Sequence, residues 1–275
     1  MKYDKSVDRL LKELSASKPW HETEIMNALA ATDELRALDA LLRHAYNFFW
    51  SGSNQFELVD RMVQRRPTLD TAKVVLSVLR AFENKEPSDG DEVGDLDRYR
   101  RWIASQFTTI GSACIPLLIE EIEQRPGKSQ AYLALALGSL RAGYESLIKT
   151  LHSDWEAIGY AAEALGYLGK KEAIPALLEA YDWVYTEWKR RYEQTRMTYS
   201  DLGNAHHNIL IALVKLDHIE RAVSTVNSDD PLNMRLNAVI ALGYSVSGEA
   251  RKVLEKLADG SDKIAEFARH TTKHS

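Results

Sequence analysis

The fold is indicated most clearly by residues 154–181, DWEAIGYAAEALGYLGKKEAIPALLEAY, which carry the pattern of two amphipathic helices joined by a short turn. Asp154 stands just before the first apolar residues and is a favourable N-cap, because its carboxylate can accept a hydrogen bond from a free backbone N–H of the first helical turn. One face of this first helix is predicted to be buried, since small or apolar side chains recur along it every three or four residues. These residues are Ala157, Ile158, Ala161, Ala162 and Leu165.

Gly166 and Gly169 are predicted to end this first helix, because glycine is unfavourable inside a helix and readily adopts the left-handed conformation of a C-cap. A second helix is predicted from about Glu172, with Pro175 in its first turn, where a backbone N–H is not required. Because an isolated pair of amphipathic helices cannot bury both apolar faces, further pairs must pack against this one.

The same arrangement recurs along the chain, with an apolar residue followed by glycine near the end of each first helix. Each of these pairs closes an apolar or alanine-rich run, and the first three lie about one helix pair apart. Such a period indicates stacked hairpins that share one continuous core. The pairs are Ile110-Gly111, Leu137-Gly138, Leu165-Gly166 and Leu242-Gly243.

The repeat that contains Asn233-Met234-Arg235, Ala238 and Ala241-Leu242-Gly243 resembles the HEAT repeat family, in particular its short bacterial type. The resemblance covers roughly residues 98–270 and implies an all-α fold, a right-handed α-α superhelix (HEAT-like solenoid) of helical hairpins. In the family, the arginine eight positions before the glycine bonds to a neighbouring repeat, and Arg235 matches it. The other repeats have Gln130, Ile158 or His206 at that position, so the resemblance does not imply a regular charged ladder.

The predicted organisation is one continuous solenoid in three parts. Residues 1–82 form irregular helical pairs, residues 83–97 form an acidic loop, and residues 98–275 form HEAT-like repeats with an insertion at 182–200. Hydrophobic residues make up 45% of the chain and charged residues 27%, as in an ordinary globular protein.

Several features of the chain bear on its environment. The single cysteine, Cys114, excludes an internal disulfide and is predicted to be a small buried residue in an apolar setting. The first residues mix both charges and contain no apolar signal core, so we expect a cytoplasmic protein. The uncharged run 102–119 is interrupted by polar residues and is not expected to span a membrane.

The acidic loop, ENKEPSDGDEVGDLD at 83–97, contains seven acidic residues and one lysine. Its composition predicts a solvated loop. The spacing from Asp89 to Asp97 partly follows a calcium-binding EF-hand loop, but it lacks an oxygen ligand at Val93 and the final glutamate at Arg100. A third interpretation is an acidic tether for a basic partner.

The insertion at 182–200 is predicted to prolong the second helix of the opening hairpin by several turns, because aromatic residues continue its stripe at helical spacing. Such a stripe is typical of packing against an adjacent helix. Exposed tryptophan, tyrosine and arginine would instead favour a protein or peptide contact, and stacking on nucleic-acid bases is a third interpretation. The candidate partner-binding residues are Trp183, Tyr185, Trp188, Arg190, Arg191 and Arg196.

The expected function is that of a non-catalytic scaffold that binds a protein or peptide on its concave face and extended helix, without a cofactor. The alternative is a DNA-binding enzyme that resembles the HEAT-like alkylpurine DNA glycosylases. The sequence pI of about 5.9 disfavours nucleic acid, since backbone binding needs a clustered positive face. The adjacent His206 and His207 point in different directions on a helix and do not form a zinc motif. The repeats are also similar to those of phycobilin lyases, but that similarity implies a fold and not a reaction.

Overall fold

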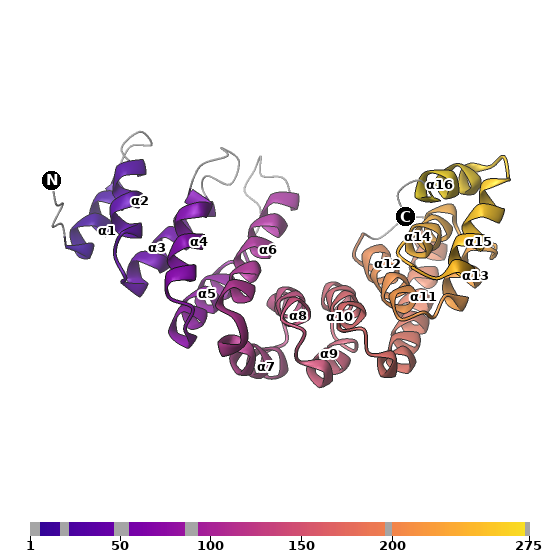
Figure 1. The fold of residues 1–275 in the computed structure, drawn as a ribbon, viewed down its shortest axis with the longest axis horizontal. Helices are drawn as coiled ribbons and strands as arrows, with labels where there is room; N and C mark the ends of the chain where they lie inside the picture. Colours follow the sequence, from indigo (N-terminus) through magenta and orange to yellow (C-terminus); the bar gives the residue numbers. More distant parts are fainter. Residues whose placement is uncertain (1–5, 17–21, 47–54, 86–92, 196–199, 273–275) are drawn as a thin grey trace. The chain divides into compact units, whose positions relative to one another are not determined.

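The computed structural model describes residues 6–16, 22–46, 55–85, 93–195 and 200–272, and all regular structure in these ranges is helical (Figure 1). The chain divides into two compact units, residues 1–121 and residues 122–275. Whether the chain forms one continuous solenoid in the three predicted parts stays a prediction.

The first unit is a stack of paired helices in which each helix packs on its next-but-one neighbour, so that odd-numbered and even-numbered helices form two rows. Thr68 starts one of them as an N-cap whose hydroxyl accepts a hydrogen bond from the Thr71 N–H. The helices are α1 (Val7–Ala16), α2 (Glu22–Ala30), α3 (Leu35–Ala45), α4 (Gln55–Arg65), α5 (Leu69–Ala81) and α6 (Val93–Ile110), followed by the 3₁₀ turn η3 (Gly111–Cys114) and α7 (Ile115–Gln124), whose residues from Ile122 onward belong to the second unit.

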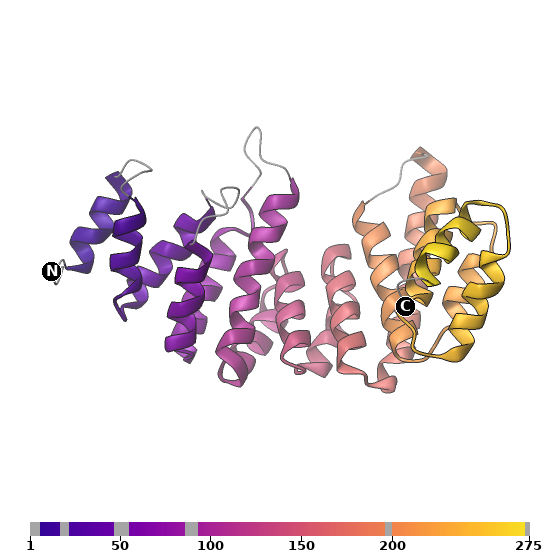
Figure 2. The ribbon, with the colours of Figure 1, turned by 45° about the horizontal axis from the view of Figure 1, so that its top comes forward.

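The second unit is built around one row of helices. Its even-numbered helices α8, α10, α12, α14 and α16 pack side by side in one row, and each odd-numbered helix packs on the even-numbered helix that follows it. Figures 1 and 2 both show α8 beside α10. The elements are α8 (Ser129–Ser139), α9 (Tyr144–Thr150), α10 (Trp155–Leu168), η4 (Lys171–Ala173), α11 (Ile174–Thr195), α12 (Ser200–Lys215), α13 (Glu220–Val226), α14 (Leu232–Leu242), α15 (Gly248–Ala258) and α16 (Lys263–Thr272).

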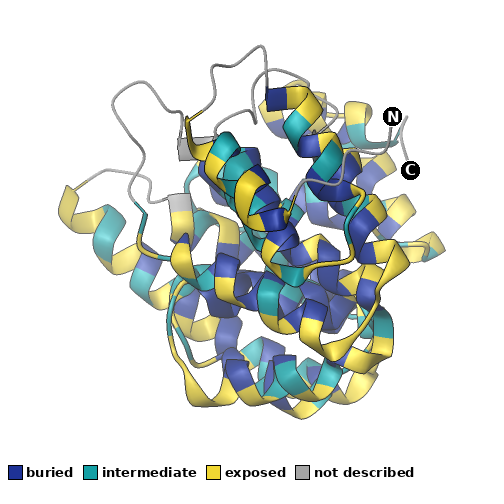
Figure 3. Ribbon diagram, turned by 90° about the vertical axis from the view of Figure 1, so that its left-hand side faces the viewer, coloured by how far each residue is buried: buried dark blue, intermediate teal, exposed yellow. Residues whose placement is uncertain are grey.

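The predicted all-α, HEAT-like hairpin architecture is confirmed. Along most helices, buried residues alternate with exposed residues at helical spacing (Figure 3), whereas the central helix α8 is buried on nearly all sides. Local predictions in the opening hairpin also hold. The Asp154 carboxylate accepts a hydrogen bond from the Ala157 N–H at 2.9 Å, and Pro175 is the second residue of α11.

The prediction that Gly166 ends the first helix is wrong, because α10 continues to Leu168 and only Gly169 adopts the left-handed C-cap, with φ 70°. Gly166 serves packing instead: a Cβ there would lie 3.0 Å from the Ala212 Cα on α12. Gly138 likewise lies inside α8, where a Cβ would lie 2.6 Å from the Ala164 Cβ on α10. Gly138 and Gly166 therefore let α8, α10 and α12 approach one another closely.

The arginine implied by the family resemblance forms its expected contact. Arg235 Nε on α14 donates to the Val226 carbonyl at the end of α13, at 2.9 Å. At the equivalent position, Gln130 Nε2 on α8 donates to the Ile122 carbonyl in the last turns of α7, at 2.7 Å. Carbonyls at a helix C-terminus lack intrahelical donors, so a side chain from the next helix satisfies them. Glutamine thus performs the bonding role where the arginine is missing.

The predicted acidic loop is shorter than expected, because α6 begins at Val93 and residues 93–97 are helical. Within this segment, Asp97 accepts a hydrogen bond from Arg101 Nε at 2.7 Å, which is an ordinary contact one helical turn apart. Asp89 and Asp91, the first two proposed calcium positions, lie outside the described residues, whereas Gly94, Asp95 and Asp97 lie in α6. In the part of the chain that the structure describes, no group of three acidic, histidine or cysteine side chains is arranged to hold a metal.

One described stretch, Leu96–Gln124, is long and apolar enough by length and composition to cross a membrane. It is not one straight helix, because Gly111 with φ 78° separates α6 from α7. Its apolar residues pack in the first unit, where Phe107 and Leu118 are buried. Cys114 is buried as predicted, and burial raises the pKa of its thiol to about 11, which disfavours the nucleophilic thiolate.

Candidate functional site

The candidate site lies on α11, which runs for 22 residues and so extends beyond the length of its neighbours α9 and α13. The predicted prolongation of this helix is confirmed as far as Thr195. Its aromatic residues divide between two faces, one against α12 and one toward solvent, and this division decides which of them can contact a partner.

The buried face carries Trp188, whose side chain is 1% exposed and whose ring stacks on Tyr192 with centroids 5.0 Å apart. Tyr181 is buried on the same face, where its hydroxyl lies 2.7 Å from the Thr225 hydroxyl and 3.1 Å from His206 Nε2. These bonds tie α11 to α12 and α13. The buried face is therefore part of the core, as the helical spacing of the aromatic residues indicated.

His206 is deeply buried in this network, and desolvation lowers its pKa to about 3. The imidazole is therefore neutral at physiological pH. Its Nδ1 atom is buried without a hydrogen-bond partner in the described residues. The ring provides a structural contact to Tyr181 and not a charged or metal-binding group.

Tyr185 lies at the border of the two faces and is half-buried. Its hydroxyl donates a hydrogen bond of 2.7 Å to Asp230, the residue that precedes Pro231 at the start of the next hairpin. Burial, together with this bond to a carboxylate, raises the pKa of Tyr185 to about 12, so the hydroxyl stays a donor. Tyr185 thus presents only part of its ring to solvent.

The exposed face carries Trp183, which is 44% exposed and whose ring lies 4.6 Å, centroid to centroid, from that of Trp155 at the start of α10. The Arg191 guanidinium lies 5.7 Å from the Trp155 ring centroid, within cation–π range. We call Trp155, Trp183 and Arg191 the tryptophan surface. It joins two aromatic rings and one cation from neighbouring helices.

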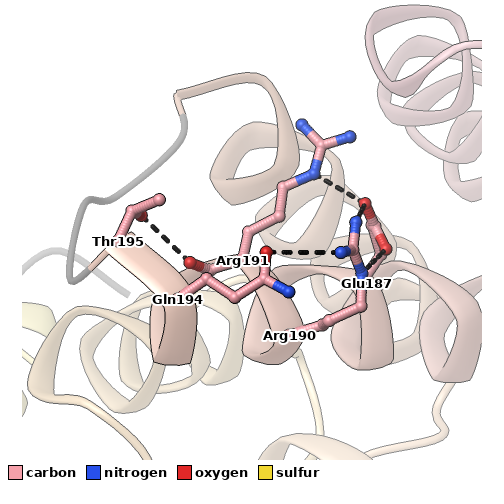
Figure 4. Close-up of polar contacts among 5 residues, drawn as sticks. All are labelled: Glu187, Arg190, Arg191, Gln194 and Thr195. Atoms are coloured by element: carbon pink, nitrogen blue, oxygen red, sulfur yellow. Dashed lines mark hydrogen bonds and ion pairs between the residues drawn. The ribbon is translucent and has the colours of Figure 1, made fainter.

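Glu187 positions the arginines beside this surface (Figure 4). Its carboxylate accepts hydrogen bonds from Arg191 Nε at 2.6 Å and from Arg190 at 2.7 and 2.8 Å. The hydrogen bonds from Arg190 and Arg191 hold the pKa of Glu187 down at about 2. Arg190 is further linked to the Gln194 side chain at 3.3 Å. The carboxylate therefore stays ionised and restrains both guanidinium groups.

The structure thus separates the predicted site residues. Trp183 and Arg191 come together at the tryptophan surface, with Arg190 next to them, whereas Tyr185 lies at its border. Trp188 belongs to the core, so we leave it out of the proposed contact surface. Arg196 lies outside the described residues. Trp155 was not predicted as a site residue from the sequence. Trp155 is the first residue of α10, so helical spacing along α11 could not connect it with Trp183.

Comparisons with known proteins identify the repeat type. Residues 159–182 match the family model for the PBS lyase HEAT-like repeat, which here spans most of α10 and the first turns of α11. No curated protein matches the chain. Among solved structures, the chain is similar to the complex of CpcE and CpcF of phycocyanin lyase from Nostoc sp. PCC7120, with 17% identity, a TM-score of 0.37, and coverage of 88% of this chain and 94% of that chain. The predicted resemblance to HEAT-like repeats is confirmed.

Proposed function

We propose that this HEAT-like repeat protein is a protein-binding module, and that the tryptophan surface is a contact site for a protein or peptide partner. The observation that carries the proposal is the packing of the exposed Trp183 ring on the Trp155 ring, with the Arg191 guanidinium also against the Trp155 ring. Tryptophan and arginine are the residue types that contribute most to binding energy at protein interfaces.

The restraint on the arginines supports this function. A guanidinium held by a carboxylate loses less conformational freedom when a partner arrives, and rigid aromatic side chains cost little to order. Glu187 provides that restraint for Arg190 and Arg191. The surface is therefore organised before binding, and the mechanism is complementarity of shape and charge without a chemical step.

Photo-crosslinking tests this function. A benzophenone amino acid at position 183 should form an adduct with one protein partner in extracts of the native cell, whereas the same amino acid at Val246, which is 99% exposed on the α14–α15 connection, should not form that adduct. The adduct at position 183 should also diminish when unlabelled protein competes. If both positions capture the same mixture of proteins, the tryptophan surface is not a specific contact site.

A DNA titration separates this function from the DNA-binding alternative. The formal net charge of −5 gives no electrostatic advantage on a phosphate backbone, and both described α11 arginines pair with Glu187. We expect weak binding to duplex DNA at physiological salt. Submicromolar binding that weakens steeply with added salt would favour the DNA-binding enzyme instead.

A further inference from the structure

A second surface of unit 2 lies where four successive even-numbered helices end. Tyr167 is in the last turn of α10, Lys215 is the last residue of α12, and Tyr244 follows the end of α14. Arg141 lies just after α8. We call these four residues the tyrosine surface. Tyr167 is 53% exposed and Tyr244 is 51% exposed, although both belong to a residue type that is usually partly covered.

Lys215 links the two tyrosines. Its Nζ atom lies 3.9 Å from the centroid of the Tyr167 ring and 5.4 Å from that of Tyr244. Within the described ranges it makes no hydrogen bond or ion pair, so its three N–H donors face no protein acceptor. Partial burial lowers the pKa of this ammonium group, while the Glu163 carboxylate acts in the opposite direction. The lysine is thus a partly desolvated cation held between two aromatic rings.

Arg141 extends the positive charge toward α8. It lines an open cleft of about 360 Å³ together with Glu163 and Tyr167, and within the part of the chain that the structure describes its guanidinium has no ion pair. Arg141 adopts a left-handed conformation with φ 52°, which is unfavourable for a residue with a side chain. The corresponding turn after α10 uses Gly169 in this conformation. In the turn after α12 the left-handed residue is Asp217, with φ 64°, so this position accepts residues with side chains, and Arg141 places a guanidinium at the edge of the cleft.

The charges that face the surface leave room for an anion. The Glu163 carboxylate acts by its charge to raise the pKa of both Tyr167 and Lys215, and Asp217, the neighbouring carboxylate after α12, pairs with Lys171 at 2.9 Å. Lys215 and Arg141, two cations without ion pairs among the described residues, therefore border exposed aromatic rings and one carboxylate, Glu163, so the local balance of charge is positive. The chemistry that complements this set is a carboxylate next to an apolar group.

We propose that the tyrosine surface docks an acidic segment of a protein partner, with one carboxylate on Lys215, a second on Arg141, and the apolar part of the segment on the rings of Tyr167 and Tyr244. The proposal rests on the protein-binding function but not on the tryptophan surface. Trp155 and Tyr167 lie twelve residues apart on α10, which places the two surfaces about 18 Å apart along that helix.

A peptide selection tests this proposal without knowledge of the partner. The probe is a displayed library of random 16-residue peptides, selected on the full-length protein at physiological salt. We expect a class of selected peptides rich in Asp and Glu that also contain apolar residues. For this class, Lys215→Gln should weaken binding by about tenfold, Arg141→Gln should weaken it further, and Lys215→Arg should retain most of it, because arginine keeps the charge.

Two controls keep the result interpretable. Circular dichroism melting should show that each variant is folded, and Trp183→Ala should leave the acidic class unaffected. Three results would each overturn the proposal: selected peptides that are not enriched in Asp and Glu, acidic peptides that bind Lys215→Gln as tightly as the wild type, and displacement of the peptides by an equal concentration of single-stranded DNA. If peptide binding is lost in Trp183→Ala but kept in Lys215→Gln, the tyrosine surface is not the docking site and the tryptophan surface is supported. If binding is lost in Lys215→Gln but kept in Trp183→Ala, only the tyrosine surface is supported.

Discussion

At the scale of single residues, His206 couples stability to pH. Desolvation lowers its pKa to about 3 in the folded protein, compared with 6.5 for an ordinary histidine, so the unfolded chain binds a proton more readily below pH 6.5. The stability that depends on neutral His206 is present above pH 6.5 and is lost progressively as the pH falls toward 3.

The first prediction follows from this loss of stability at low pH. Between pH 7 and pH 5, the wild type should lose about 2 kcal/mol more unfolding free energy than His206→Gln, which cannot be protonated. Urea unfolding at both pH values measures the difference. His207, whose pKa burial also lowers, is present in both proteins, and its charge lowers the pKa of His206, so the difference reports His206 together with its interaction with His207. Equal pH dependence of the two proteins would show that His206 is not buried as a neutral ring.

The second prediction concerns the left-handed Arg141. Arg141→Gly should raise the free energy of unfolding by about 0.5–1 kcal/mol, since relief of the left-handed strain outweighs the added flexibility of glycine in the unfolded chain. The matched control is Arg125→Gly, at an exposed position after α7, where no such gain is expected. Thermal unfolding measures both. A loss of stability in Arg141→Gly would mean that the arginine side chain stabilises the fold and is not retained for binding.

At the scale of helices, the repeated glycines set how closely the even-numbered helices pack. The third prediction is that Gly138→Ala destabilises the protein by about 1–3 kcal/mol, because the added Cβ would lie 2.6 Å from the Ala164 Cβ and 2.7 Å from the Ala164 Cα, so backbone must shift. Gly203→Ala on α12 is the control, because nothing lies within 4 Å of its added Cβ, and it should stabilise the helix by up to about 1 kcal/mol. Destabilisation of both variants alike would contradict this packing role.

The fourth prediction separates the two tryptophans of α11. Trp188→Ala should cost about 3–5 kcal/mol, because it removes a large side chain that is 1% exposed. Trp183→Ala should cost less than about 1 kcal/mol, because its ring is largely at the surface. Chemical denaturation of the two variants under identical conditions measures both. Similar losses would show that Trp183 also belongs to the core.

These elements show what could be predicted from the sequence. Asp154 as a cap and Pro175 in a first turn follow from local chemistry, and the structure confirms both. The role of Gly166 does not follow, because it depends on Ala212, which lies 46 positions later and packs against it on α12. The helical periodicity predicted that Trp188 lies on a buried face of its helix. It could not show whether the candidate site lies on that face or on the neighbouring exposed face. Only the position of Trp155 shows that Trp183 belongs to a surface with two rings.

The tyrosine surface was only partly open to prediction from the sequence. Tyr167 and Tyr244 each directly follow a repeated Leu-Gly pair, and Lys215 follows Leu213-Val214, so the three residues hold one repeat position, but their exposure and the part played by Arg141 depend on how the helices pack. They meet because the even-numbered helices pack side by side with their C-terminal ends at one edge. Repeat proteins build binding surfaces in this manner, with one or two residues from each repeat.

At the scale of the whole molecule, each helix contacts mainly its next and next-but-one neighbours within its unit. The fifth prediction is that the effect of a core substitution decays along the stack. In Trp188→Ala, amide hydrogen exchange should accelerate in α10–α14, whereas α2–α5 of the first unit should exchange as in the wild type. Uniform acceleration along the chain would show that the two units unfold as one cooperative body.

The central claim is that the tryptophan surface binds a protein partner, and the affinity of the crosslinked partner for Trp183→Ala tests it most directly. Titration calorimetry should show affinity reduced at least about tenfold relative to the wild type, as for a residue that contributes strongly to an interface. Val246→Ala, which removes an exposed apolar side chain elsewhere in the same unit, should bind as the wild type does. Unchanged affinity of Trp183→Ala would contradict the claim.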